Sequence, residues 1–147
     1  MINSGDFNFS FSGLKTAVLY KFKKLQKNLS ASEKELLITE LAVEFQQASV
    51  DVLVKKTLAA GKKYGAKTIL LAGGVSANQK LRHQLGEAIK KNLPDTAYKI
   101  PPTAYTGDNA AMIGAAAHFR WQKMTDKNKK QAENNWKILE AQANLRL

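Results

Sequence analysis

Small and polar residues connect an apolar run to a helix-forming run in the stretch LLAGGVSANQKLR, residues 70–82. Gly73 and Gly74 end the apolar run, and Ser76 and Asn78 precede the next helix. Glycines at the carboxyl end of a strand permit close backbone approach, and free N–H groups at a helix start favour a phosphate or the polar edge of a nucleoside. A tight connection without a ligand uses the same residue types, so the turn alone leaves both interpretations open.

Asp108 is a second candidate, because it follows Gly107 at the start of another helix-forming run. A carboxylate there can bind a metal ion, whereas a plain helix cap by Thr106 or Asp108 needs no ligand. The two histidines, His83 and His118, fall on different predicted helices. They therefore predict neither a local metal chelate nor a catalytic triad.

A third polar cluster contains Ser10, Ser12, Gly13, Lys15 and Thr16, between a predicted strand and a predicted helix. Its composition is typical of a phosphate-binding turn, but the Walker spacing of glycines and lysine is absent. A capped strand–helix junction would use the same residues, so both interpretations stay open.

The elements that must position these clusters follow from hydrophobic spacing and from helix and turn signals. The predicted helices begin at Ser12, at a capping box over Ser32–Glu35, after Asn78 and after Asp108, and the second is the longest, ending near Gly65. The predicted strands lie at 7–13, 67–72 and 96–100, and the apolar run 67–72 indicates a central parallel strand covered on both faces. This alternation predicts an α/β fold.

Composition limits the function classes. Of the 147 residues, 23 are Lys or Arg and 12 are Asp or Glu, a formal net charge of +11. This charge fits a polyanionic partner or a solvated basic surface. No cysteine is present, which excludes disulfides and thiolate catalysis within the chain. No signal peptide is evident and no apolar run approaches the roughly 20 residues that span a bilayer, so a cytoplasmic protein without membrane contact is expected.

Residues 1–124 are expected to form one domain, followed by a basic polar tail over 125–147. The strong apolar anchors of this tail are Trp136, Ile138 and Leu139, which permit a helix.

Three motifs in order, FSFSGLKTAV (9–18), LLAGGVSANQKLR (70–82) and PPTAYTGDNAAMIG (101–114), closely resemble the C-terminal half of the tRNA threonylcarbamoyladenosine transferases, the TsaD family, formerly called O-sialoglycoprotein endopeptidases. The resemblance covers roughly residues 7–119. It implies the C-terminal lobe of an actin-like ATPase fold (ASKHA, ribonuclease H-like), in which a nucleotide lies between two lobes.

The resemblance also implies a reaction and its site residues. The family transfers a threonylcarbamoyl group from threonylcarbamoyl-adenylate to the tRNA adenosine beside the anticodon, and works with TsaB and TsaE. By motif, Asn78 would hydrogen-bond the donor nucleotide, and Gly73 and Gly74 would line its pocket with Ser76 and Ser12. The nucleotide ligand would be threonylcarbamoyl-adenylate, or ATP or ADP. Asp108 would be one ligand of an iron or zinc ion that polarises the carbamoyl carbonyl for attack.

The chain departs from the family pattern in one respect that matters for activity. The family takes its other metal ligands from a His-x-x-x-His motif in its first half, and this sequence has no such motif. We therefore expect a C-terminal lobe that lacks its N-terminal partner and is inactive alone. The competing interpretation is a noncatalytic nucleotide- or nucleic-acid-binding module of the same fold. The C-terminal lobe of a sugar kinase is disfavoured by the Ser-Gly-Leu-Lys-Thr and Gly-Asp-Asn-Ala-Ala-Met matches.

Overall fold

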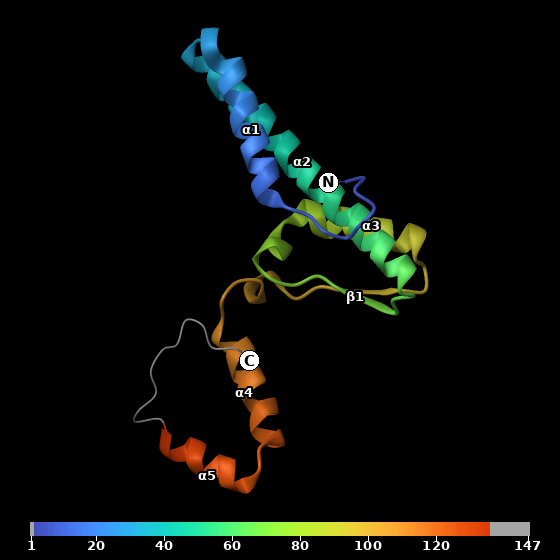
Figure 1. The fold of residues 1–147 in the computed structure, drawn as a ribbon, viewed down its shortest axis with the longest axis vertical. Helices are drawn as coiled ribbons and strands as arrows, with labels where there is room; N and C mark the ends of the chain where they lie inside the picture. The colour runs from blue at the N-terminus through green and yellow to red at the C-terminus, as the bar shows by residue number, and fades with distance from the viewer. Residues whose placement is uncertain (1, 136–147) are drawn as a thin grey trace. The chain divides into compact units, whose positions relative to one another are not determined.

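The computed structural model describes residues 2–135. The elements in chain order are α1 (Phe11–Leu25), η1 (Gln26–Asn28), α2 (Ala31–Lys63), β1 (Thr68–Leu70), η2 (Gly74–Ala77), α3 (Gln79–Asn92), β2 (Ala97–Lys99), η3 (Thr103–Tyr105), α4 (Ala110–Lys123) and α5 (Asp126–Asn135) (Figure 1). The chain divides into two compact units, Met1–Thr106 and Gly107–Leu147, and each is described by itself. The expected division after residue 124 falls inside the second unit, at the step from α4 to α5.

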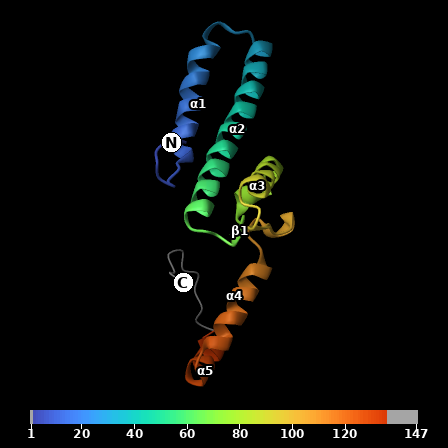
Figure 2. The same cartoon turned by 90° about the vertical axis from the view of Figure 1, so that its right-hand side faces the viewer.

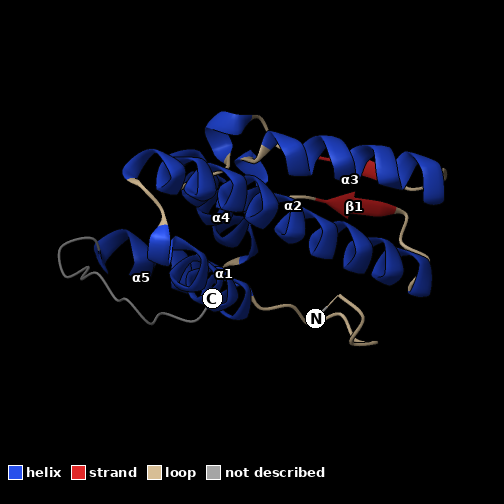
Figure 3. Ribbon diagram, turned by 90° about the horizontal axis from the view of Figure 1, so that it is seen from above, coloured by secondary structure: helices blue, strands red, loops and turns tan. Residues whose placement is uncertain are grey.

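A parallel pair of strands, β1 and β2, lies in the first unit, and α3 is in the connection between them. In the strand register, Ile69 of β1 is paired with Tyr98 of β2. Helices α2 and α3 pack on the face that carries these two side chains (Figure 3). The core of this layer consists of Val50, Leu81, Leu85 and Ile89. Burial of each Leu or Ile stabilises the layer by roughly 1.5–3 kcal/mol, and three of the four core residues lie on α3.

The opposite face of the strand pair is not covered by the described residues. Thr68, Leu70, Ala97 and Lys99 are all exposed, and Leu70 keeps 68 % of its surface accessible. The prediction that the strand at 67–72 is covered on both faces is therefore wrong for the described residues. A continuous apolar run is typical of burial on both faces, but the described core places helices on one face of these strands alone.

Helix α2 has 33 residues and is the longest, as predicted, but its cap lies two residues earlier than expected. Ser30 is the N-cap, and Glu33 closes the capping box by accepting a hydrogen bond from the Ser30 N–H at 2.8 Å. The expected pair was Ser32 and Glu35. The sequence contains both Ser-x-x-Glu pairs, and the earlier start adds two residues to the helix, including the strong helix former Ala31.

Helix α1 lies antiparallel beside the first part of α2, joined to it by η1 (Figures 1 and 2). The strand predicted at 7–13 is wrong, because α1 already begins at Phe11 and residues 7–10 form no strand. Side-chain hydrogen bonds hold the N-terminal residues just before it, Ser4 and Asp6, on α2. Lys56 of α2, which is buried, donates to the Ser4 hydroxyl at 2.9 Å and to Asp6 Oδ1 at 2.9 Å. The hydrogen bond from Ser4 holds the pKa of Asp6 well below its usual range, and the hydrogen bond from Lys56 lowers this pKa further.

The second unit contains α4 and α5 among its described residues. No residue of α4 is buried, and Ile113 and Phe119 keep 69 % and 63 % of their surface exposed. Helix α5 occupies part of the predicted tail. The expected anchors Trp136, Ile138 and Leu139 lie outside the described residues.

Candidate nucleotide site

The turn between β1 and α3 has the open backbone that close approach of a ligand requires. Gly73 adopts φ +82°, a conformation that L side chains rarely adopt, and leads into η2. A Cβ built on Gly73 or on Gly74 would meet no atom within 4 Å. The turn is closed by a hydrogen bond from the Ser76 N–H to the Gly73 carbonyl at 2.9 Å. The space beside both glycines is therefore open.

Asn78 caps α3, so part of its side chain has a structural task. Its Oδ1 accepts a hydrogen bond from the Leu81 N–H at 3.0 Å, which is ordinary N-capping. Within the described part of the chain, the Asn78 Nδ2 group has no hydrogen-bond partner. One half of the amide thus stabilises the helix, and the other half remains a donor for a ligand.

Asn78 lines a cavity of about 330 Å³ in the first unit. Its walls come from the start of α1, the middle of α2, the turn after β1 and the start of α3. The lining residues are Phe11, Phe45, Gln46, Ser49, Val50, Leu53, Val75, Asn78 and Leu81. Two aromatic rings and four aliphatic side chains surround a few polar groups, a composition typical of small-molecule sites.

The residues of α2 in this cavity were missed by sequence reasoning. Phe45 and Ser49 are one helical turn apart, and the Ser49 hydroxyl donates to the Phe45 carbonyl at 2.8 Å. Their spacing in EFQQAS predicts no more than a helix face. The one sequence signal for a ligand site here is an aromatic residue, Phe45, followed by two glutamines. An ordinary amphipathic helix displays the same combination.

Ser76 lies inside the turn and not on its surface. The residue is fully buried, and its hydroxyl has no hydrogen-bond partner among the described residues. A buried hydroxyl without a partner costs free energy that a paired one does not. The expected contact of Ser76 with a nucleotide thus requires the turn to change shape, and it stays a prediction.

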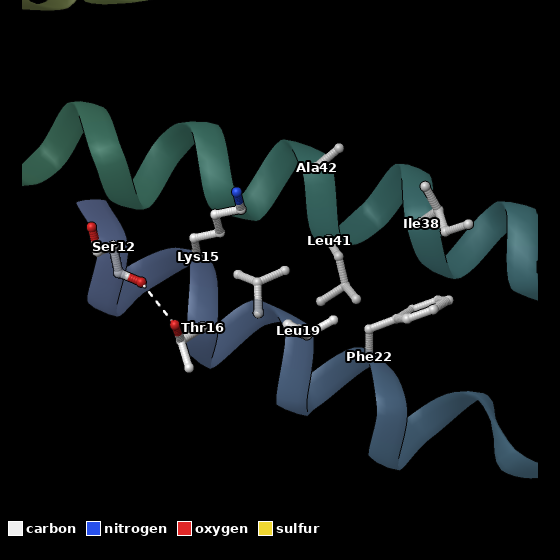
Figure 4. Close-up of a pocket in the computed structure, with 9 residues that line it drawn as sticks. Ser12, Lys15, Thr16, Leu19, Phe22, Ile38, Leu41 and Ala42 are labelled. Atoms are coloured by element: carbon white, nitrogen blue, oxygen red, sulfur yellow. Dashed lines mark hydrogen bonds between the residues drawn. The ribbon is translucent and has the colours of Figure 1, made fainter.

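Ser12 does not line the cavity that contains Asn78. It lies instead on a groove of about 640 Å³ between α1 and α2, with Lys15, Leu19, Phe22 and Leu41 among its neighbours (Figure 4). The Ser12 carbonyl accepts a hydrogen bond from the Thr16 hydroxyl at 3.0 Å. Its neighbour Phe11 is the residue of this segment that reaches the Asn78 cavity.

Asp108 belongs to the second unit, and it does not cap α4. The predicted cap by Thr106 or Asp108 is wrong, because Asn109 Oδ1 accepts the hydrogen bond from the Met112 N–H at 2.9 Å. Asn109 occupies the extended position directly before the first helical residue, where capping geometry is possible. Asp108 is exposed, without a hydrogen bond or ion pair to any described residue. Its carboxylate is therefore accessible.

The donor set around this carboxylate does not complete a metal centre. Among the described residues, no group of three or more His, Cys, Asp or Glu side chains could hold a metal ion. His118 pairs with Gln122 at 3.0 Å, and His83 is exposed on α3. Catalytic zinc sites generally use three protein ligands. Among the described residues, Asp108 thus lacks the companions that would complete an iron or zinc site with it.

Arg82, on α3, is a further residue that sequence reasoning did not single out. Its Nε donates to the Ser76 carbonyl, and its Nη2 donates to the Pro101 carbonyl at 3.0 Å. The first acceptor belongs to the turn after β1, and the second to the loop after β2. Tyr98, beneath α3, has a pKa raised by burial and opposed by the nearby Arg82 charge.

The parallel strands, their helical connection and the open turn after β1 define an α/β protein with a candidate ligand site at the carboxyl ends of its strands. A sequence profile of the family described as tRNA N6-adenosine threonylcarbamoyltransferase, TsaD, matches residues 2–115. The chain therefore belongs to this family. Membership confirms the expected resemblance, and with it the actin-like fold class, for which the mixed and mostly helical α/β structure is suitable.

Individual relatives carry the same description. The protein named tRNA N6-adenosine threonylcarbamoyltransferase in Listeria innocua is 49% identical over 116 residues, which is 79% of this chain and 33% of the relative. The protein of that name in Lacticaseibacillus casei is 45% identical over 123 residues, 84% of this chain and 35% of the relative. The chain thus spans about a third of the length of these relatives. No helix among residues 2–135 has the length and apolarity that a membrane span requires.

Proposed function

We propose that the chain acts as the C-terminal lobe of a tRNA N6-adenosine threonylcarbamoyltransferase and contributes part of its adenylate pocket. The observation that carries this proposal is the cavity of about 330 Å³ into which Asn78 brings an amide, beside the open turn at Gly73 and Gly74. Family membership supports the choice of an adenylate as the ligand. The donor would be threonylcarbamoyl-adenylate, with ATP or ADP as related ligands.

The chemistry of the cavity suits a purine nucleotide. Phe11 and Phe45 offer apolar surface to a flat base, and the Asn78 Nδ2 group offers a donor to one of its ring nitrogens. The N–H groups at the turn and at the start of α3 favour the negative charge of a phosphate. Apolar burial and a few polar contacts would together fix the orientation of the base.

Asp108 would provide one ligand of an iron or zinc ion whose other ligands come from the N-terminal lobe. When bound, such an ion supplies Lewis acidity toward a carbonyl oxygen. Asp108 itself offers an exposed carboxylate that capping does not occupy. Because the described residues supply no complete set of metal ligands, we expect the chain alone to give no multiple-turnover modification of tRNA. A tRNA modification assay with this chain as the sole protein tests that expectation, and sustained turnover would contradict it.

The remaining partners follow from the same proposal. The substrate is tRNA, whose phosphates suit the net charge of +11. Proteins of the TsaB and TsaE families, together with the N-terminal lobe, would complete the working assembly in the cytoplasm.

The test of the pocket is a calorimetric titration of the chain with AMP and with ATP. Asn78→Ser keeps a good helix cap but removes the amide donor, so we expect AMP affinity to fall about tenfold with little change in stability. Ser30→Ala, which removes the cap of a different helix and leaves the cavity intact, controls for any general effect of a weakened helix cap on AMP affinity. Equal AMP affinity in wild type and Asn78→Ser would contradict the proposed site.

A noncatalytic nucleic-acid-binding module is the second candidate, favoured by charge. The segment that forms α1 and η1 carries Lys15, Lys21, Lys23, Lys24 and Lys27 and no acidic residue. Binding through charge alone would weaken steeply with salt and ignore Asn78→Ser, whereas base recognition would depend on Asn78 at every salt concentration.

A further inference from the structure

Arg82 joins two segments that lie at the same end of the strand pair. The hydrogen bond from the Leu71 N–H to the Lys99 carbonyl, at 3.0 Å, is placed directly after the paired residues of β1 and β2. Beyond it, the chain continues as the turn 73–78 on one side and the loop 101–106 on the other. Arg82 reaches both, with Nε on the Ser76 carbonyl and Nη2 on the Pro101 carbonyl at 3.0 Å.

The chemistry of the guanidinium suits this arrangement. Its five N–H donors lie in one plane and point in fixed directions, so one group can hold two acceptors in a set geometry. Both acceptors are backbone carbonyls, so the bonds fix the course of the main chain in each segment. The described part of the chain places no carboxylate within ion-pair distance of Arg82, and the guanidinium is thus not occupied by a salt bridge.

The backbone on both sides of this connection is already locally ordered. In the turn, the Asn78 N–H donates to the Val75 carbonyl at 3.1 Å. In the loop, the Tyr105 N–H donates to the Pro102 carbonyl at 2.9 Å and the Thr106 N–H to the Thr103 carbonyl at 3.1 Å. Because the turn 73–78 and the loop 101–106 are each ordered by their own hydrogen bonds, the Arg82 guanidinium that joins them can make them move together.

We propose that Arg82 is a positioning residue that couples the turn 73–78 to the loop 101–106. Through this coupling, a nucleotide held at the turn also fixes the loop, which is the segment that precedes Asp108 in the sequence. The nucleotide part of this inference rests on the proposed function. The coupling itself is a property of the unliganded chain and can be tested without any ligand.

A matched control exists at the other end of the same strands. The Thr96 hydroxyl donates to the Ala66 carbonyl at 2.8 Å, which joins the segment before β2 to the segment before β1. Thr96→Val removes this connection and leaves Arg82 in place. It therefore controls for the general effect of losing one side-chain bond between two connecting segments.

The experiment measures amide hydrogen exchange by NMR in wild type, Arg82→Lys and Thr96→Val. A lysine is a point donor that cannot hold both carbonyls in one geometry. We expect Arg82→Lys to speed exchange of the Asn78, Tyr105 and Thr106 amides about tenfold. Thr96→Val should leave these amides unchanged and speed exchange of the Ala97 amide, which bonds to the Lys67 carbonyl at 2.9 Å. Unchanged exchange in either the turn or the loop of Arg82→Lys would overturn the coupling.

A second measurement separates the coupling from the proposed function. If wild type binds AMP, Arg82→Lys should bind it about tenfold more weakly. Thr96→Val should bind AMP as tightly as wild type does, and the thermal midpoint of each variant shows how far its stability has changed. Equal AMP affinity in wild type and Arg82→Lys would overturn the positioning role. A wild-type chain that does not bind AMP would refute the proposed pocket, and the exchange data would still decide the coupling. Should Arg82→Lys not fold, Arg82→Gln, which can reach a single carbonyl, takes its place.

Discussion

Asn78 illustrates how one side chain can serve both the fold and a ligand. Sequence reasoning assigned it to nucleotide binding by resemblance, and the structure adds that its Oδ1 caps α3. The two tasks use different atoms of the same amide. An alanine substitution would therefore mix a loss of stability with a loss of binding, which is why a serine is the sharper test.

At the same scale, Lys56 and Asp6 hold the N-terminal segment on α2. The contribution of Asp6 has a definite pH dependence, because its folded-state pKa lies below the unfolded value of about 3.9. Such a group stabilises the folded chain above the unfolded pKa, and this stabilisation is lost as the pH falls through the folded pKa. The anchor should thus persist from pH 7 down to about 4 and weaken only below that.

We predict that Asp6→Asn releases this segment at pH 7, whereas wild type does so only in acid. The ring of Phe7, whose centroid lies 5.9 Å from that of Tyr64, reports the release through its NMR shifts. Asp126→Asn, in the second unit, controls for the loss of one negative charge. An Asp6→Asn spectrum that matches wild type at pH 7 would show that Lys56 holds the segment without the carboxylate.

At the scale of elements, the start of α2 gives a direct comparison of two equivalent sequence signals. We predict that Ser30→Ala lowers the free energy of unfolding by about 1 kcal/mol, because the Ser30 side chain and N–H both take part in the capping box. Ser32→Ala should change it by less than about 0.5 kcal/mol, because Ser32 lies inside the helix. Chemical denaturation of both variants checks this, and a reversed order would place the cap at Ser32.

This comparison also shows what the sequence could predict. The helices after Ser12 and Asn78 and the long helix followed from periodicity, because burial of one helix face requires it. The two strands followed from short runs of strand-forming residues between turn signals, although the two-sided burial expected of the first was wrong. The exact cap of α2 did not follow, since two Ser-x-x-Glu pairs, offset from each other by two residues, compete for the role. The strand predicted at 7–13 failed because alternation of Phe with Asn or Ser is only a local signal for one covered face, whereas residues 7–10 form no strand and α1 already begins at Phe11.

The sequence likewise predicted some residues of the candidate site and missed others. Glycines and Asn78 were visible because turn and cap residues are local signals. Phe45 and Gln46 of α2 and the Arg82 bond to Pro101 were not, since these depend on which distant segments the fold brings together. Ser12 was grouped with the same site by resemblance, but it lines a different groove.

At the scale of the whole molecule, large apolar side chains remain accessible in both units. Leu36, Leu70 and Ile113 keep 62 %, 68 % and 69 % of their surface exposed. We predict that the native chain enhances the fluorescence of the apolar dye ANS several-fold more than a typical folded domain of its size. Addition of the remaining portion of a relative, produced as a separate protein, should reduce the signal. Weak dye binding by the chain alone would contradict the expectation.

Helix α2 has one further consequence. Ile38, Leu41 and Ala42 form a wall of the groove beside α1, and Phe45, Gln46 and Ser49 form a wall of the cavity that contains Asn78. A single rod of 33 residues, about 50 Å long, thus separates and bounds two hollows that follow each other along its axis. A rotation of this rod that widens one hollow must turn the next row of side chains as well. A substitution that shifts α2 therefore moves side chains in the walls of both hollows.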